Sequence, residues 1–204
     1  MDNEALESEA VKFLGRDFDQ CFSQLRHYDN QTMEIVKFAF TAFTATIGAG
    51  LALLKYGEDR HIDYAGSAQA IFAIGLTIGL CLLGMLNLNR AYFVVVARYI
   101  NSLRNHFLKV APLGYLNPTE FYSDDRDPRY FNWKSSQAFL VYVMSAANAF
   151  LLSTFISTGA SQRPPAIIYL ICSGIAAFLL QVAGSVAYLL IREGKASSTG
   201  KSQQ

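Results

Sequence analysis

The sequence predicts an all-α integral membrane protein, a bundle of four transmembrane helices with a helical layer on its cytosolic side. The first supporting observation is composition. Of the 204 residues, 52% are hydrophobic and only 16% are charged, against about 25% charged in an ordinary soluble domain. The charges are also clustered, which leaves four long stretches without Asp, Glu, Lys or Arg: 38–54, 64–89, 135–162 and 164–191. The third observation is an uneven distribution of Lys and Arg among the connecting segments.

The charge-free stretches set the expected membrane spans. Each is near or above the roughly 17–25 residues that a helix needs to cross the hydrocarbon core. The first stretch is the shortest, and Lys37 and Lys55 at its ends can extend their amines to the interfaces. The acidic start of the chain does not fit a secretory signal peptide, so we expect the first span itself to direct insertion. The expected spans are 36–55, 65–88, 136–157 and 164–191.

The basic residues predict the orientation. The two ends of the chain and the central connection together hold 14 Lys and Arg residues, and the two other connections hold 3. Cytoplasmic segments carry the excess of basic residues, because such segments resist translocation. We therefore expect both termini and the central connection in the cytoplasm, with short outer loops at about 55–63 and 158–163. The simplest location is a bacterial inner membrane.

Residues 1–35 predict a cytosolic amphipathic helix. Apolar and aromatic side chains recur at alternating intervals of three and four residues, with a break at Thr32, which is a heptad pattern. About three heptads are marginal for a coiled coil. The pattern thus favours a helix packed on the rest of the same chain over an oligomerising coiled coil or a helix lying on the membrane. The stripe comprises Val11, Leu14, Phe18, Cys21, Leu25, Tyr28 and Ile35.

The second helix is expected to continue beyond its span, into the cytosol, to about residue 110. Helical spacing persists after residue 88, and neither Gly nor Pro interrupts the extension before Pro112. Outside the bilayer its apolar stripe needs a partner, and the N-terminal helix, expected on the same side, is the natural one. The stripe comprises Tyr92, Val95, Tyr99, Leu103 and Phe107.

Two segments are expected to be irregular. Residues 111–134 form a cytosolic loop rich in aromatic residues and Pro, and we expect it to be ordered against the headgroups or the cytosolic helices. Residues 192–204 are mostly Ser, Gly, Lys and Gln, and this composition predicts a disordered cytosolic tail.

The spans contain no acid, base or histidine, which disfavours proton-coupled transport and carboxylate- or His-based catalysis within the membrane. Outside the spans, Asp124, Asp125 and Asp127 form the one cluster able to chelate a hard cation. A turn is the favoured interpretation of that cluster, because Arg126 and Arg129 can neutralise the acids. The sequence predicts no catalytic residue, metal site or cofactor. Dispersed Lys and Arg residues argue against nucleic-acid binding.

Uncharged polar and small residues within the spans are the candidate site residues. Asn148 and Gln181 are the most costly to expose to lipid. They either bond to neighbouring helices, which we favour, or line a wet path through an oligomer. Gly75 and Gly79 form a GxxxG motif, which permits close helix approach within the bundle or between copies. The helix-packing or pore candidates are Gly48, Gly75, Gly79, Asn148, Gln181 and Gly184; further polar residues in the spans include Thr44, Thr77, Ser145, Ser153 and Ser185.

Three functional hypotheses remain. The first is a non-enzymatic, self-associating inner-membrane protein that acts as a membrane effector, or as an anchor or sensor subunit for a cytosolic partner at 1–35 and 89–134. The second is a channel or transporter, which would require Thr44, Thr77, Asn148 and Gln181 to converge on one axis. The third and weakest is a membrane-interface enzyme that uses Asp124, Asp125 and Asp127.

Overall fold

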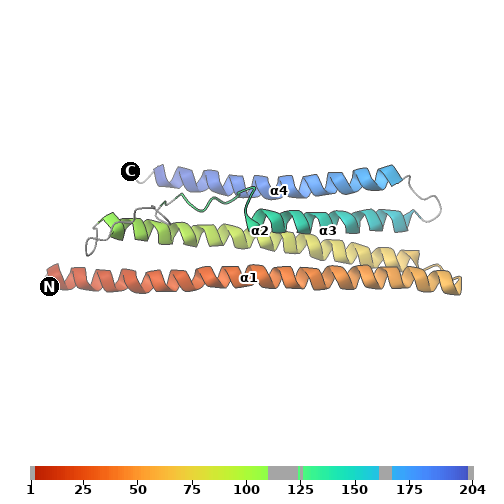
Figure 1. Ribbon diagram of the computed structural model, residues 1–204, viewed down its shortest axis with the longest axis horizontal. Helices are drawn as coiled ribbons and strands as arrows, with labels where there is room; N and C mark the ends of the chain where they lie inside the picture. Colours follow the sequence, from red (N-terminus) through yellow and green to blue (C-terminus); the bar gives the residue numbers. More distant parts are fainter. Residues whose placement is uncertain (1–2, 110–123, 125, 161–166, 202–204) are drawn as a thin grey trace. The chain divides into compact units, whose positions relative to one another are not determined.

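The computed structural model describes residues 3–109, 124, 126–160 and 167–201. Over these residues the chain forms four helices and no strand, which confirms the predicted all-α class. Figure 1 shows their order along the chain. The helices are α1 (Asn3–Arg60), α2 (Ala65–Lys109), α3 (Ser136–Gly159) and α4 (Ile167–Lys201).

Each of the helices α1 to α4 is long and apolar enough to cross a membrane. A helix rises 1.5 Å per residue, so even α3, with 24 residues, exceeds the about 30 Å thickness of a hydrocarbon core. This is the architecture of a multi-pass membrane protein.

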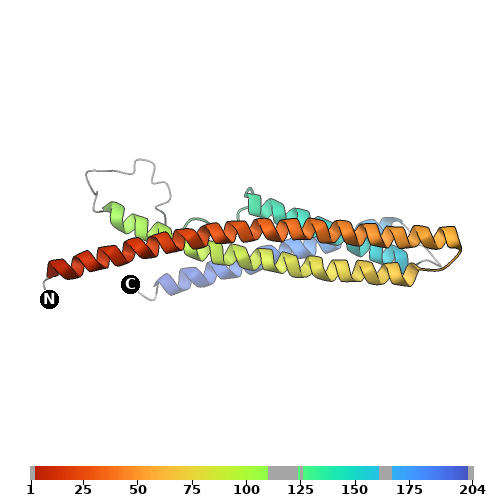
Figure 2. The same ribbon diagram turned by 90° about the horizontal axis from the view of Figure 1, so that it is seen from below.

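The chain divides into two compact units, each built from segments distant in sequence. The bundle unit comprises Met33–Leu88 and Phe131–Gln204. The hairpin unit comprises Met1–Thr32 and Asn89–Tyr130. Within each unit, the parts of α1 and α2 that belong to it lie side by side, as the two views in Figures 1 and 2 show.

Helix α1 is one uninterrupted helix of 58 residues, although the sequence pattern suggested separate segments at 1–35 and 36–55. The break in the heptad pattern at Thr32 does not end the helix, and the Thr32 hydroxyl Oγ1 accepts a hydrogen bond from Asn89 Nδ2 at 2.7 Å. A polar side chain is thereby accommodated in an otherwise apolar stripe. The helix also continues to Arg60, through part of the expected outer loop, and α2 begins after Asp63, whose carboxylate accepts from Ala65 N at 2.9 Å.

The core of the bundle unit comes mainly from α1, α2 and α3. It contains Ile35, Ala39, Phe43, Ala68, Phe72, Leu82, Leu83, Leu86, Val141, Met144 and Leu151. Helix α4 packs beside α3, but most of its large apolar side chains are exposed, among them Ile168, Leu179 and Leu180. Such a surface is stable in hydrocarbon, where apolar side chains need no cover.

Two expectations need correction. The tail was expected to be disordered from residue 192, but α4 continues to Lys201. Extending an existing helix costs much less than starting one, so a short polar stretch can remain helical. The predicted stripe on the α2 extension is also not its buried face. Tyr92 and Val95 are more than half exposed, whereas Val94 and Ile100 are buried. Of the predicted irregular segment 111–134, residues 111–123 and 125 lie outside the described residues.

Candidate functional site

Asn148 and Gln181, the two polar candidates in the spans, meet inside the bundle unit. Asn148 on α3 is fully buried, and its Nδ2 donates to Oε1 of Gln181 on α4 at 2.9 Å. Gln181 Nε2 in turn donates to the carbonyl of Ala177 at 3.2 Å. The two amides therefore join α3 to α4 within one chain.

Gly79 provides the space that Asn148 needs. A Cβ at Gly79 would collide with Asn148 Oδ1 and would lie 2.7 Å from the ring of Phe43. Only a residue without a side chain lets α2 approach α3 so closely. The Gly79 Hα that occupies this direction faces the amide oxygen, a weak contact that partly compensates for burial of that oxygen.

The other glycine of the GxxxG motif contacts a different helix. A Cβ at Gly75 would collide with the side chain of Thr46 on α1. The motif thus lets two helices of the bundle unit pack closely on α2. Thr46 of α1 packs against Gly75, and Asn148 of α3 packs against Gly79. By contrast, Gly48 and Gly184 are exposed, and a Cβ added at either would meet nothing within 4 Å.

Three amide side chains that the sequence analysis did not single out also bond between helices of the bundle unit. Asn87 Nδ2 donates to Ser185 Oγ at 2.8 Å. Gln137 Nε2 donates to the carbonyl of Leu86 at 3.3 Å, and Gln69 Nε2 to that of Phe155 at 3.5 Å. Asn and Gln were overlooked near the ends of spans because their position there fits an interfacial location equally well.

The four polar residues that a pore would require do not converge. Thr44 and Thr77 are exposed, and the Thr77 hydroxyl donates to the carbonyl of Ala73 at 2.9 Å. Asn148 and Gln181 face each other in the interior. Within one chain, Asn148 and Gln181 are thus used for a contact between helices, and Thr77 bonds within its own helix.

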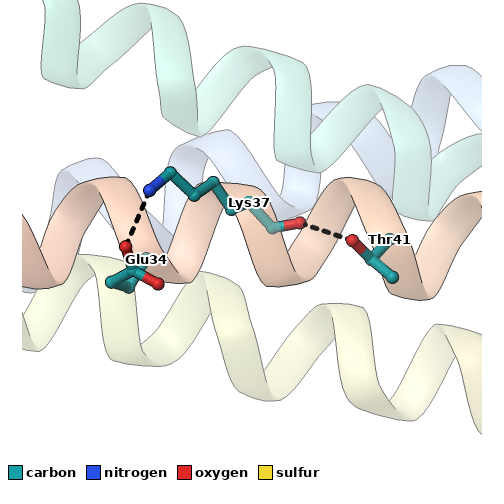
Figure 3. A network of polar contacts seen from close by, with 3 residues as sticks. All are labelled: Glu34, Lys37 and Thr41. Carbon is teal, nitrogen blue, oxygen red and sulfur yellow. Dashed lines mark hydrogen bonds and ion pairs between the residues drawn. The ribbon is translucent and has the colours of Figure 1, made fainter.

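A charged pair on α1 lies beside the first apolar stretch (Figure 3). Lys37 Nζ lies 2.8 Å from Glu34 Oε1, and both side chains are mostly exposed, at 67% and 71%. One turn further, Thr41 Oγ1 donates to the Lys37 carbonyl at 3.0 Å. The pair neutralises the last charge before 17 uncharged residues, 38–54, as expected at the edge of a span.

In the hairpin unit, polar side chains of α2 hold the main chain that precedes α3. Arg90 Nη2 donates to the carbonyl of Arg129 at 2.8 Å, and Arg98 Nε to that of Pro128 at 3.1 Å. Buried Asn101 donates through Nδ2 to the carbonyls of Asp124 and Asp127, at 3.1 and 2.8 Å. All of these bonds end on main-chain carbonyls of the segment before α3. They therefore hold its backbone and do not depend on the side chains of the residues that supply the carbonyls.

Two of the three carboxylate candidates, Asp124 and Asp127, take part in hydrogen bonds typical of a turn. Asp124 Oδ1 accepts from Arg126 N at 2.8 Å, and the Asp124 carbonyl accepts from Asp127 N at 3.2 Å; Asp125 lies outside the described residues. A carboxylate that accepts from its own main chain two residues on is typical of a turn. Within the part of the chain that the structure describes, no group of three or more His, Cys, Asp or Glu could hold a metal ion.

Contacts between α1 and α2 hold the hairpin unit together. Asn89 Nδ2 donates to the Tyr28 carbonyl at 2.7 Å, and the rings of Tyr28 and Tyr92 stack with centroids 6.2 Å apart. The Tyr99 hydroxyl donates to Asp17 Oδ2. Tyr28, Tyr92 and Tyr99 belong to the two expected stripes, and a Tyr ring can pack there while its hydroxyl still reaches a polar group.

The hairpin unit contains a partly open, mainly apolar cavity of about 420 Å³. This volume lies within the range of about 300–1,000 Å³ usual for small-molecule sites. Asp29 lies on its wall, and burial raises the pKa of this carboxyl, although the nearby Arg90 opposes the shift. Burial also lowers the pKa of Arg90. The cavity is lined by Phe22, Leu25, Asp29, Phe93, Ala97, Ile100, Asn101, Arg104 and Pro128.

Comparisons of the chain with protein-family models, with curated proteins and with solved structures find no match.

Proposed function

We propose that this chain is a non-enzymatic inner-membrane protein that anchors a cytosolic partner or senses it. In this proposal the bundle unit crosses the bilayer four times with both termini in the cytoplasm. The hairpin unit is the cytosolic layer that receives the partner. The excess of Lys and Arg in the termini and the central connection supports this orientation.

One observation carries the proposal. Outside the charge-free stretches, α2 exposes a row of apolar and aromatic side chains along one face, with Tyr92 55%, Val95 54% and Tyr99 44% exposed. In hydrocarbon such a row would need no explanation, but in water a contiguous apolar patch marks an interaction surface. The cavity of the same unit, with Asp29 and Arg104 on its wall, is a second place where a signal molecule could bind.

Self-association is part of the proposal and rests on α4. Its exposed side includes the small residues Ala183, Gly184 and Ala187 among larger apolar ones. Small residues on a lipid-facing surface let helices of two copies approach closely.

The test places a photo-crosslinking amino acid at Val95 in the full chain, expressed in a bacterial inner membrane. The proposal predicts a discrete adduct with one soluble protein, and loss of the native complex with that protein on Val95→Asp. The matched control is Ser23→Asp, an exposed position on α1 of the same unit, which should leave the complex intact. If position 95 crosslinks only to lipid, the row lies in the membrane and the proposal fails.

A further inference from the structure

The cavity of the hairpin unit has a buried, mainly apolar side and an acidic residue at its open side. Ala97, Ile100 and Asn101 on α2 line it and are 8%, 2% and 3% exposed, so they form its deep side. Asp29 on α1 belongs to the same wall but is exposed. A molecule in this cavity would therefore have apolar side chains around its inner part and a negative charge beside its outer part.

The Asp29 carboxylate has no partner in the part of the chain that the structure describes. It takes part in none of the ion pairs or hydrogen bonds there. The nearby Arg90 does not pair with it, because the Arg90 guanidinium donates to the carbonyls of Arg129 and Tyr130. Partial burial raises the pKa of Asp29 in spite of Arg90, as expected for a carboxylate whose charge is not fully compensated.

A second acceptor on the cavity wall lies deeper. Asn101 donates through Nδ2 to the carbonyls of Asp124 and Asp127. An amide nitrogen carries two protons, so both are used, and the amide oxygen accepts no hydrogen bond from a described residue. The wall thus offers two acceptors, one charged and one neutral, to a ligand that donates.

Arg104, the basic residue among the described lining residues, does not offset these acceptors. Its guanidinium carbon Cζ lies 5.4 Å from the centre of the Phe18 ring, and Phe18 does not line the cavity. The charged end of Arg104 is therefore directed to Phe18, while its methylene stem can cover apolar surface. Among the described polar groups of the wall, those without a partner are acceptors, which favours a cation over an anion.

The rest of the wall fits an apolar ring or a short apolar chain. Phe22 and Leu25 come from α1, and Phe93, Ala97 and Ile100 come from α2. Aromatic side chains pack well against a planar ligand. The cavity volume of about 420 Å³ is far larger than the roughly 30 Å³ that a water molecule occupies. An organic molecule, rather than a single water or ion, is therefore of the appropriate size.

We propose that this cavity binds an amphipathic organic cation, with its ring or chain among the apolar side chains and its ammonium group bonded to Asp29. An N–H or O–H group on the inner part of the ligand donates to Asn101. Hydrogen bonds between ionised partners are the stronger ones, so the ammonium contributes most to selectivity. The site deepens the sensing role proposed above, on which it rests, by naming the chemical class of the signal molecule.

Tryptamine is a suitable probe because it has an ammonium group, an apolar ring and an N–H donor. Its binding to the full chain in detergent micelles would be measured by isothermal titration calorimetry, with protein-free micelles as the blank. Tryptamine should bind, and Asp29→Asn should weaken binding by at least about fivefold, since a charge-assisted hydrogen bond at a partly exposed position is lost. The matched control is Asp19→Asn, at an exposed carboxylate of α1 outside the cavity wall, which should bind as wild type does.

The corresponding anion separates the effect of charge from that of shape. Indole-3-propionate keeps the ring and replaces the ammonium with a carboxylate, so it should bind much more weakly than tryptamine. Nuclear Overhauser effects should connect the tryptamine ring protons to the Ile100 methyl groups of the wild-type protein. Equal affinity of wild type and Asp29→Asn for tryptamine, a preference for the propionate, or ring contacts with detergent alone would overturn the proposal.

This outcome is separable from that of the proposed function. If tryptamine does not bind but the crosslinked adduct at Val95 forms, the cation site is wrong and the anchoring role stands. If tryptamine binds with the expected dependence on Asp29 and no soluble protein is captured at Val95, the site is confirmed and the anchoring role is refuted.

Discussion

Asn148 on α3 and Gln181 on α4 form a hydrogen bond of 2.9 Å between two uncharged amides inside the bundle unit. Both groups would be expensive to expose to hydrocarbon. Their hydrogen bond satisfies one polar group of each amide and joins α3 to α4. Gly79 on α2 has no side chain and so leaves room for Asn148. Asn148 thus contacts both neighbours of α3 in this region, α4 through Gln181 and α2 through Gly79.

A double-mutant cycle of Asn148→Leu and Gln181→Leu measures this link. Hydrogen bonds between membrane helices average about 0.6 kcal/mol and reach about 1.7 kcal/mol. We expect a favourable coupling in the upper part of this range, because Asn148 is fully buried. Unfolding in mixed micelles provides the measurement. Strict additivity of the two substitutions would contradict the pairing.

Alanine at the glycines should give opposite results at different sites. Gly79→Ala and Gly75→Ala place a methyl group against Asn148 and Thr46, and overpacking of this kind costs about 1–3 kcal/mol. Gly48→Ala and Gly184→Ala meet nothing within 4 Å, so the better helix propensity of Ala should leave stability equal or up to about 1 kcal/mol higher. If thermal unfolding shows the same loss of stability for all four variants, the distinction between packed and open glycines is wrong.

Asn101 should control the segment before α3. Asn101→Leu removes both bonds to the carbonyls of Asp124 and Asp127 and leaves these groups to water, so the segment should open more often. Limited proteolysis near residues 124–130 should therefore accelerate severalfold. Asn30→Leu, at an exposed position of α1, is the control. An unchanged cleavage rate in Asn101→Leu would show that the bonds do not restrain the segment.

The Asp29 carboxyl should lower stability at neutral pH. Burial raises its pKa above the ordinary value of 3.8, so the folded chain holds this proton more tightly than the unfolded chain. Stability then falls as the pH rises from about 3.8 through the raised pKa, and the penalty is complete at neutral pH.

Replacing Asp29 with Asn removes that penalty. Asp29→Asn should therefore unfold at a higher temperature than wild type at pH 7, and the difference should disappear below pH 3.8, the ordinary value of the group. The increase should be small, because Asp29 is exposed and water screens its charge. If the variant is less stable at pH 7, attraction to Arg90 outweighs burial.

Much of the fold could be predicted from short stretches of the sequence taken one at a time. Charge-free length predicts the helices, and the absence of Gly and Pro after Leu88 predicts that α2 continues to Lys109. The face that a helix buries depends on its neighbours. Tyr92 and Val95 match the apolar period, yet the packed face contains Val94 and Asn101, because α1 and the segment before α3 together select it.

Contacts between residues far apart in the chain could not be predicted from the sequence, because they too depend on how neighbouring helices pack. Asn148 and Gln181 could be ranked as costly to expose, since cost depends on residue type. Whether the two meet, and whether Gly79 or Gly48 lies against Asn148, depends on how the helices are rotated about their axes. Asn87 was overlooked because, near the end of a span, an amide has water as an equally good partner.

The most direct test of the account is the membrane topology of the full chain. Single cysteines introduced at Asn3, Asp59 and Ser198 would be labelled with a membrane-impermeant thiol reagent in intact bacterial cells, in a background where Cys21, Cys81 and Cys172 are replaced by Ala. The account predicts labelling at position 59 alone, with positions 3 and 198 reacting only after the cells are opened. Labelling of either terminal position in intact cells, or release of the chain from membranes by salt, would contradict four crossings with both ends in the cytoplasm.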